Sequence, residues 1–125
     1  MINVRELRLG NWVSLLGDFH QIDGIYLDFN LGSVHLEGNA IYNNADKIEP
    51  IPITEEILLK CGFEKKEEIG KYIGYSNVAI SIWHNKVNNT FLVDNISKVE
   101  VYIEHLHQLQ NLIYALSGQE LEINL

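Results

Sequence analysis

The chain has 125 residues, of which 46% are hydrophobic and 21% are charged, and its net charge is −8. These values are typical of one small globular domain and exclude a disordered chain. No cluster of basic residues is larger than Lys65–Lys66, which argues against direct binding to DNA or RNA because phosphate groups require basic partners.

The first part of the chain, residues 1–52, has the pattern of a small β-structure. Short strands are expected at Asn11–Leu16, Phe19–Asp28, Ser33–Glu37, Ala40–Tyr42 and Lys47–Ile51. Turn residues separate these segments about every ten residues, as in small all-β structures. The sequence therefore predicts a curled sheet or a small barrel of short strands.

A short helix is expected where the second part, residues 53–125, begins. Pro52 holds the chain extended, Thr54 is a favourable N-cap, and Gly62 is a favourable residue to end a helix. The helix should therefore run from Thr54 to about Cys61. Because each part is small for an independent core, we expect a single domain made of these two parts.

The rest of the second part predicts an antiparallel meander followed by a helix. Residues Glu64–Lys71 are expected to form a polar loop. The four strands expected after it are Lys71–Tyr75, Val78–His84, Thr90–Asp94 and Lys98–Ile103. Residues Glu104–Ser117 place apolar side chains on one broad arc of a helix, and that arc should pack on the meander. The expected fold class is α+β.

Groups that could do chemistry are scattered along the chain. The five histidines, the carboxylate pairs and the single cysteine, Cys61, match no nucleophile, metal-binding or phosphate-binding motif. His105 and His107 would point away from each other on a helix, whereas helical metal ligands are three or four residues apart. Cys61 fits a small buried apolar position better than a reactive thiol. We therefore predict no catalytic residue, no metal site and no cofactor.

The C-terminal helix carries one polar arc that would suit a partner. His107, Gln110, Asn111 and Tyr114 lie on this arc, and all four are uncharged at neutral pH and able to donate and accept hydrogen bonds. Directional contacts of this kind occur at protein interfaces, so these residues form a candidate interaction face. The alternative is that they hydrogen-bond only to the neighbouring half of the same protein.

Aromatic residues are interleaved among the expected strands, as they are on surfaces that stack nucleic-acid bases. Most of them fall at inward-facing positions of the strands and are assigned to the core. Trp83 and Tyr102 share strand faces with polar residues and are expected to be partly exposed.

Three segments carry a resemblance to a known family. They are RLGNWV (Arg8 to Val13), EPIPITEEILLKCGFEKK (Glu49 to Lys66) and HLHQLQNLIYALSGQEL (His105 to Leu121), about a third of the chain. Together they resemble a family of small uncharacterised proteins of Bacteroidetes and of their phages and prophages. That family commonly has aromatic residues at the positions of Ile57 and Cys61, so this chain is an atypical member at that helix. The resemblance implies a phage, prophage or gut-bacterial context and supplies no catalytic residues.

These observations favour a non-catalytic interaction or accessory module whose partner is another protein. One alternative is an acidic accessory or mimic that acts on a nucleic-acid-handling enzyme, because the charge of −8 is spread over both halves of the chain. Another is a small hydrolase-like enzyme that uses His84, His105 or the carboxylates. The first ten residues lack the apolar centre of a signal peptide, and no apolar run reaches the ~20 residues that span a membrane. A cytoplasmic location is therefore expected.

Overall fold

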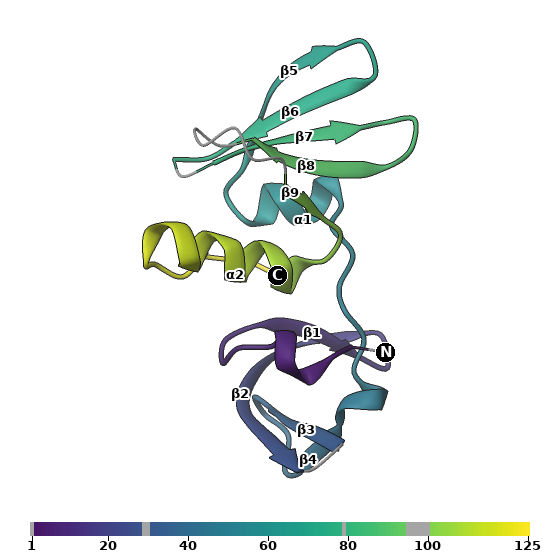
Figure 1. Ribbon diagram of the computed structural model, residues 1–125, viewed down its shortest axis with the longest axis vertical. Coiled ribbons are helices and arrows are strands. Elements are labelled where there is room, and N and C mark those ends of the chain that lie inside the picture. The colour runs from purple at the N-terminus through teal and green to yellow at the C-terminus, as the bar shows by residue number, and fades with distance from the viewer. Residues whose placement is uncertain (1, 29–30, 79, 95–100) are drawn as a thin grey trace. The chain divides into compact units, whose positions relative to one another are not determined.

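The computed structural model describes residues 2–28, 31–78, 80–94 and 101–125 (Figure 1). Within these residues the chain has two antiparallel sheets, of four and five strands, with one short and one longer α-helix. The predicted α+β class is confirmed. Contacts divide the chain into two compact units. Unit 1 comprises Met1–Pro52 and His105–Asn111, and unit 2 comprises Ile53–Glu104 and Leu112–Leu125.

Unit 1 is built on a four-stranded sheet with the order β1-β2-β3-β4. The strands are β1 (Trp12–Leu15), β2 (Asp18–Asp28), β3 (Leu31–Leu36) and β4 (Tyr42–Asn44), and short 3₁₀ helices occupy Val4–Glu6 and Ala45–Lys47. Leu16 and Gly17 connect β1 to β2, and both have positive φ angles, of 52° and 86°. Positive φ at both central residues is the geometry of a type I′ turn, whose twist matches that of the two strands.

The core of unit 1 lies against one face of this sheet. Its buried members are Ile2, Val13, Ile22, Val34, Leu36 and Ile48. β1 and β4 are the two ends of the sheet, and no strand pairing joins them among the described residues. The small barrel that the sequence allowed is therefore not closed in this part of the chain, and the sheet remains open.

Unit 2 begins with the short helix α1 (Glu55–Lys60), which the sequence predicted. The hydroxyl of Thr54 accepts a hydrogen bond from the backbone N–H of Ile57 at 3.1 Å, as an N-cap does. Gly62 follows the helix with a φ of 84°, which a side chain would disfavour. Both ends of α1 are therefore set by local residues.

The sheet of unit 2 has five strands in the order β5-β6-β7-β8-β9. They are β5 (Glu64–Ile69), β6 (Tyr72–Ser76), β7 (Ser81–Asn85), β8 (Thr90–Asp94) and β9 (Val101–Ile103). The prediction of four strands was one short, because β5 was expected to be a polar loop. All six β5 residues are exposed, so the strand has no apolar alternation, and its charges protect the edge of the sheet. The expected strand residues 79 and 98–100 lie outside the described part.

Helix α2 (Leu106–Ser117) is the longer helix. It starts two residues later than predicted, because His105 forms a β-bridge with Pro52 and Leu106 donates its N–H to the carbonyl of Ile51 at 2.8 Å. Residues 106–111 of α2 belong to unit 1, and its remaining residues belong to unit 2. None of the helices in the described ranges is long and apolar enough to cross a membrane.

Candidate functional site

The four residues of the predicted interaction face are in different environments. His107 and Gln110 are 1% and 2% exposed, and Asn111 is partly buried. Tyr114 is 43% exposed and belongs to unit 2, whereas the other three belong to unit 1. Within unit 1 these three residues form hydrogen bonds with other residues of the same chain. Internal hydrogen bonding of this kind is the alternative that the sequence left open.

Gln110 is paired with the backbone at the start of β1. Its side-chain oxygen accepts a hydrogen bond from the N–H of Trp12 at 2.8 Å, and its side-chain nitrogen donates to the carbonyl of Gly10 at 3.1 Å. The carboxamide thus makes the two hydrogen bonds that the peptide groups of a neighbouring strand would make. It satisfies the N–H of Trp12, and it shares the carbonyl of Gly10 with Gln21 Nε2, which also lies 3.1 Å from that oxygen.

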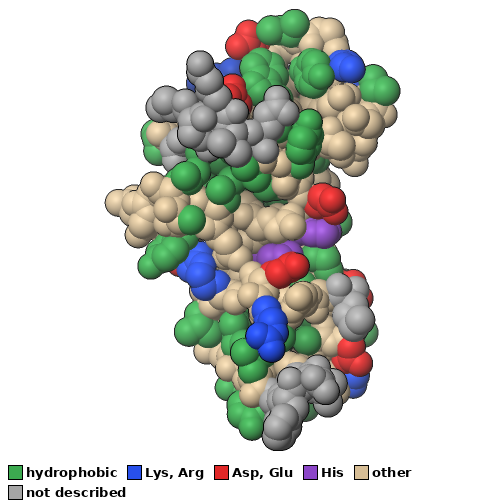
Figure 2. Space-filling view, viewed as in Figure 1, with side chains coloured by type: hydrophobic (Ala, Val, Ile, Leu, Met, Phe, Trp, Pro, Cys, Tyr) green, Lys and Arg blue, Asp and Glu red, His purple; other side chains and the backbone are tan. Residues whose placement is uncertain are grey.

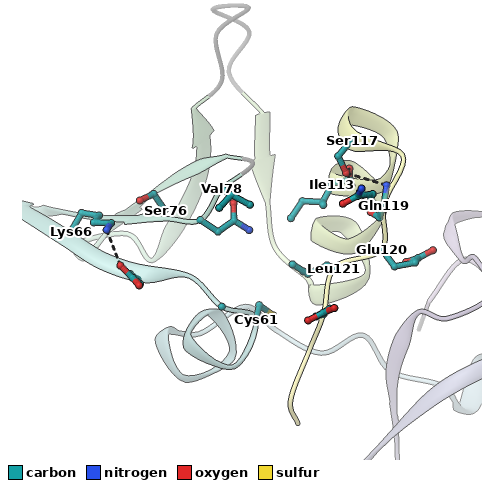
Figure 3. Close-up of a pocket in the computed structure, with 13 residues that line it drawn as sticks. Cys61, Lys66, Ser76, Val78, Ile113, Ser117, Gln119, Glu120 and Leu121 are labelled. Atoms are coloured by element: carbon teal, nitrogen blue, oxygen red, sulfur yellow. Dashed lines mark hydrogen bonds and ion pairs between the residues drawn. The ribbon is translucent and has the colours of Figure 1, made fainter.

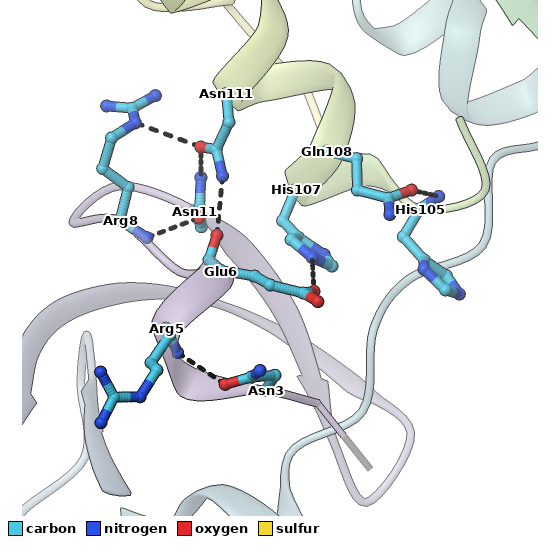
Figure 4. Close-up of polar contacts among 9 residues, drawn as sticks. All are labelled: Asn3, Arg5, Glu6, Arg8, Asn11, His105, His107, Gln108 and Asn111. Atoms are coloured by element: carbon cyan, nitrogen blue, oxygen red, sulfur yellow. Dashed lines mark hydrogen bonds and ion pairs between the residues drawn. The ribbon is translucent and has the colours of Figure 1, made fainter. Parts of the chain in front are cut away.

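Asn111 extends this connection through a network of four hydrogen bonds (Figure 4). Its side-chain oxygen accepts from Arg8 Nε at 3.1 Å and from the amide of Asn11 at 2.8 Å. Its own amide donates to the carbonyl of Glu6 at 2.9 Å, and the Asn11 oxygen accepts from the Arg8 N–H at 2.7 Å. We call Glu6, Arg8, Asn11, Gln110 and Asn111 the polar junction. Within unit 1 it joins residues 6–12 to Gln110 and Asn111 of α2.

His107 lies beside the polar junction and is buried as a neutral base. Burial lowers the pKa of His107, an effect that the neighbouring Glu6 carboxylate opposes, and Nε2 lies 3.4 Å from that carboxylate. The rings of His105 and His107 are stacked, with centroids 5.8 Å apart. The prediction that these two rings point apart was wrong, because His105 precedes α2. Even so, the described residues contain no group of three or more His, Cys, Asp or Glu side chains placed to hold a metal ion.

The other potentially reactive groups have structural contacts. Burial raises the pKa of the Cys61 thiol to about 12, so the thiol stays protonated and is a poor nucleophile. His84 contacts the side-chain oxygen of Asn89 through Nε2 at 2.8 Å and stacks on Phe91. His35 contacts the carboxylate of Asp23. The hydrogen-bond partners of His84 and His35 are an amide and a carboxylate, which are not the hydroxyl or thiol that a general base would activate.

Unit 2 contains a groove of about 680 Å³, which we call the unit 2 groove (Figure 3). It is lined by Cys61, Gly62, Glu64, Lys66, Ser76, Asn77, Val78, Ile113, Ser117, Gln119, Glu120, Leu121 and Glu122. Val78, Ile113 and Leu121 come from three different segments and point into the same space. The C-terminal segment that forms one wall is tied to α1, because Asn124 donates its N–H to the carbonyl of Lys60 at 3.0 Å.

The rim of the unit 2 groove carries a surplus of negative charge. Three carboxylates and one ammonium group belong to the lining. The ammonium group of Lys66 lies 2.8 Å from a carboxylate oxygen of Glu64 and lowers the pKa of that carboxyl. The last turn of α2 contains no basic residue, so the partial negative charge at the helix C-terminus has no counter-charge within that turn.

The outward-facing side of the β5–β9 sheet is rich in exposed apolar residues. Ile69, Tyr72, Trp83, Leu92 and Tyr102, which we call the outer sheet face, lie on it. Register places Trp83 opposite Leu92 and Leu92 opposite Tyr102, and Ile69 pairs with Tyr72. Ile69 and Tyr102 are each 59% exposed and Tyr72 is 39% exposed. A shallow depression of about 270 Å³ is lined by the first four of these residues.

Gly74 sets the position of the Trp83 indole on this face. A Cβ atom at Gly74 would lie 3.0 Å from Cζ3 of Trp83, a distance too short for ordinary packing. The ring therefore covers the backbone of β6 where no side chain is present. An aromatic ring laid over a cross-strand glycine is a recognised way to protect a strand. The Trp83 side chain is therefore partly buried against β6.

The sequence indicated this surface only in part. Trp83 and Tyr102 were expected to be partly exposed, and they are partly buried and 59% exposed, respectively. Ile69 and Tyr72 were missed, since β5 was not predicted and its pairing with β6 places them on this face. The sequence signal that could have indicated this surface is the presence of apolar residues on both faces of β7 and β8. The unit 2 groove left no such signal, because distant segments form it.

Comparison with known proteins identifies no relative of this chain. No family model, no curated protein and no solved structure matches it.

Proposed function

We propose that the protein is a non-catalytic interaction module and that its partner is another protein bound at the outer sheet face. The observation that carries this proposal is the set of three aromatic and two aliphatic side chains on one solvent-facing side of the sheet. Antiparallel sheets with one wet face ordinarily carry polar residues there. Contiguous exposed apolar patches on soluble proteins mark interaction sites.

The composition of the outer sheet face supports a protein partner. Tyrosine and tryptophan dominate the binding energy of protein interfaces, because each buries a large rigid area at a small entropic cost. Lys71, whose Nζ is 5.5 Å from the centroid of the Tyr72 ring, adds a charged group at the border. An apolar centre with a charged border is the usual anatomy of such an interface.

A non-catalytic role is supported by the contacts of the reactive groups. The Cys61 thiol is protonated, and His84 and His107 are engaged with Asn89 and Glu6. The hydrolase alternative therefore has no specific observation in its favour. The resemblance of the three sequence segments supports a source in Bacteroidetes or their phages and prophages.

Direct binding to nucleic acid has little support. On the face seen in Figure 2, Lys and Arg side chains are scattered and acidic side chains lie among them. Among the described residues of each unit, the surface seen in Figure 2 has no continuous acidic stripe, as a mimic of nucleic acid would need. The alternative of an acidic mimic is therefore weaker than that of an interaction module.

The proposed module includes the packing of α2 on the five-stranded sheet. The side of the sheet opposite the outer sheet face is buried, and so is Ile113 of α2, which supports this packing within unit 2; the buried sheet residues are Ile73, Tyr75, Ile82, Phe91 and Val93. Such packing would cover one side of the sheet and leave the outer sheet face for the partner.

Photo-crosslinking tests the proposed function. A photoreactive phenylalanine analogue is placed at position 102 in the full chain, and a matched variant carries it at Tyr26 of unit 1. The two positions are suited to comparison because Tyr26 and Tyr102 are both 59% exposed. In a Bacteroides lysate we expect position 102 to crosslink one protein that position 26 does not, and we expect Trp83→Ser to abolish the product. Identical products from both positions would refute the proposal.

A further inference from the structure

The unit 2 groove is large enough to hold a segment of another molecule. Its volume of about 680 Å³ falls in the range of roughly 300–1,000 Å³ that is usual for ligand sites. It is a separate surface from the outer sheet face, so an inference about it goes beyond the proposed function.

Three aliphatic side chains come together in the lining of the groove. Val78 is fully exposed to solvent, Leu121 is partly buried, and Ile113 is 4% exposed. Figure 3 shows their side chains directed into the groove from the β6–β7 connection, the C-terminal segment and α2. An aliphatic side chain placed among them would remove apolar surface from water on both partners.

The rim selects for positive charge. Lys66 is already paired with Glu64, so it offers little attraction to an anion. Glu122 belongs to the lining and is exposed, and the C-terminal end of α2 lies in the same wall. A carboxylate and a helix C-terminus both favour a nearby cation.

We propose that the unit 2 groove binds an extended segment of another protein that carries a Lys or Arg side chain next to an aliphatic side chain. The aliphatic side chain contacts Val78, Ile113 and Leu121, and the cation lies at the rim beside Glu122. Repulsion from the exposed carboxylate of Glu122 disfavours an acidic segment and nucleic acid at the same place.

Three capped hexapeptides test this proposal. One alternates valine with lysine, one valine with glutamate, and one serine with lysine. Each is titrated into the full ¹⁵N-labelled chain, and the amide shifts of Ser76, Val78 and Leu121 are followed by NMR. The valine–lysine peptide should shift these amides and bind at least about tenfold more tightly than either other peptide. Its affinity should fall as salt is raised, since the charges are exposed.

A charge-reversal variant tests the role of the rim. Glu122→Lys should weaken the valine–lysine peptide about fivefold, whereas Glu37→Lys, a matched change at an exposed residue of unit 1, should leave binding unchanged. Circular dichroism checks that both variants fold. Equal binding of the valine–glutamate peptide, equal effects of the two variants, or no shift of these amides at millimolar peptide would each overturn the proposal.

Discussion

Replacing Gln110 with leucine tests whether the polar junction stabilises unit 1. The change nearly conserves side-chain volume but removes the acceptor for the Trp12 N–H and the donor to the Gly10 carbonyl. The carbonyl of Gly10 keeps a second donor, because Gln21 Nε2 also lies 3.1 Å from it. The Trp12 N–H loses its partner.

The magnitude follows from these two bonds. Each intramolecular hydrogen bond contributes about 1 kcal/mol, and an orphaned buried donor costs a further ~1–3 kcal/mol. Burial of the leucine side chain offsets part of this loss. We therefore expect Gln110→Leu to lower the free energy of unfolding of unit 1 by about 2–3 kcal/mol. With an m-value of about 1.5 kcal/mol/M, the urea midpoint should fall by about 1–2 M.

The two tryptophans allow the units to be followed separately. Trp12 belongs to unit 1 and Trp83 to unit 2, so a Trp83→Phe background leaves Trp12 fluorescence as the reporter of unit 1. Gln119→Leu, the same change at an exposed residue of unit 2, is the control, and it should change the free energy of unfolding reported by Trp12 by less than about 0.5 kcal/mol. A midpoint for Gln110→Leu that moves no further than that of the control would show that the hydrogen bonds of Gln110 do not stabilise unit 1.

Three further predictions concern single groups. Because burial lowers the pKa of His107 below 6.5, the unfolded state binds a proton that the folded state does not. The contribution of neutral His107 to the free energy of unfolding should therefore be fully present above pH 6.5 and be lost as the pH falls below it. If urea titrations show that the free energy of unfolding of His107→Gln depends on pH with the same slope, this prediction is wrong. Burial raises the pKa of Cys61 to about 12, so a thiol-reactive disulfide reagent at pH 8 should label the native chain at least ~100-fold more slowly than the urea-unfolded chain, and similar rates would count against it. Gly74→Ala places a Cβ atom 3.0 Å from Trp83 and should lower the free energy of unfolding by about 1–3 kcal/mol. In a Trp12→Phe background its Trp83 emission should shift to longer wavelength, and an unchanged spectrum would show that the indole does not cover the glycine.

Local signals in the sequence were sufficient for the helices and most of the strands of unit 2. Thr54 and Gly62 fixed the ends of α1 because an N-cap hydroxyl and a left-handed glycine act on their immediate neighbours. Strands β7 and β8 could likewise be predicted from their alternating apolar residues, because one face of each strand is buried. Strand β5 could not be predicted from the sequence, since its six residues are all exposed and its conformation depends on pairing with β6.

The partners of the polar arc of α2 could not be predicted from the sequence. Helical spacing placed His107, Gln110 and Asn111 on one side of a helix, but it contains no information about which chain segment covers that side. The partner of Gln110 is Trp12, 98 positions away, and that of Asn111 is Asn11, 100 positions away. Residues that suit a protein interface also suit an internal junction, because both require directional hydrogen bonds without buried charge.

The most direct test of the outer sheet face as a binding site uses the purified crosslinked partner. Its affinity is measured for the Tyr102→Ala and Tyr26→Ala variants. Isothermal titration calorimetry compares both variants with the intact chain, and the two tyrosines have equal exposure, 59%. We expect Tyr102→Ala to weaken binding at least about fivefold, as truncation of an interface hot spot does, and Tyr26→Ala to bind like the intact chain. Equal affinities for the two variants would contradict it.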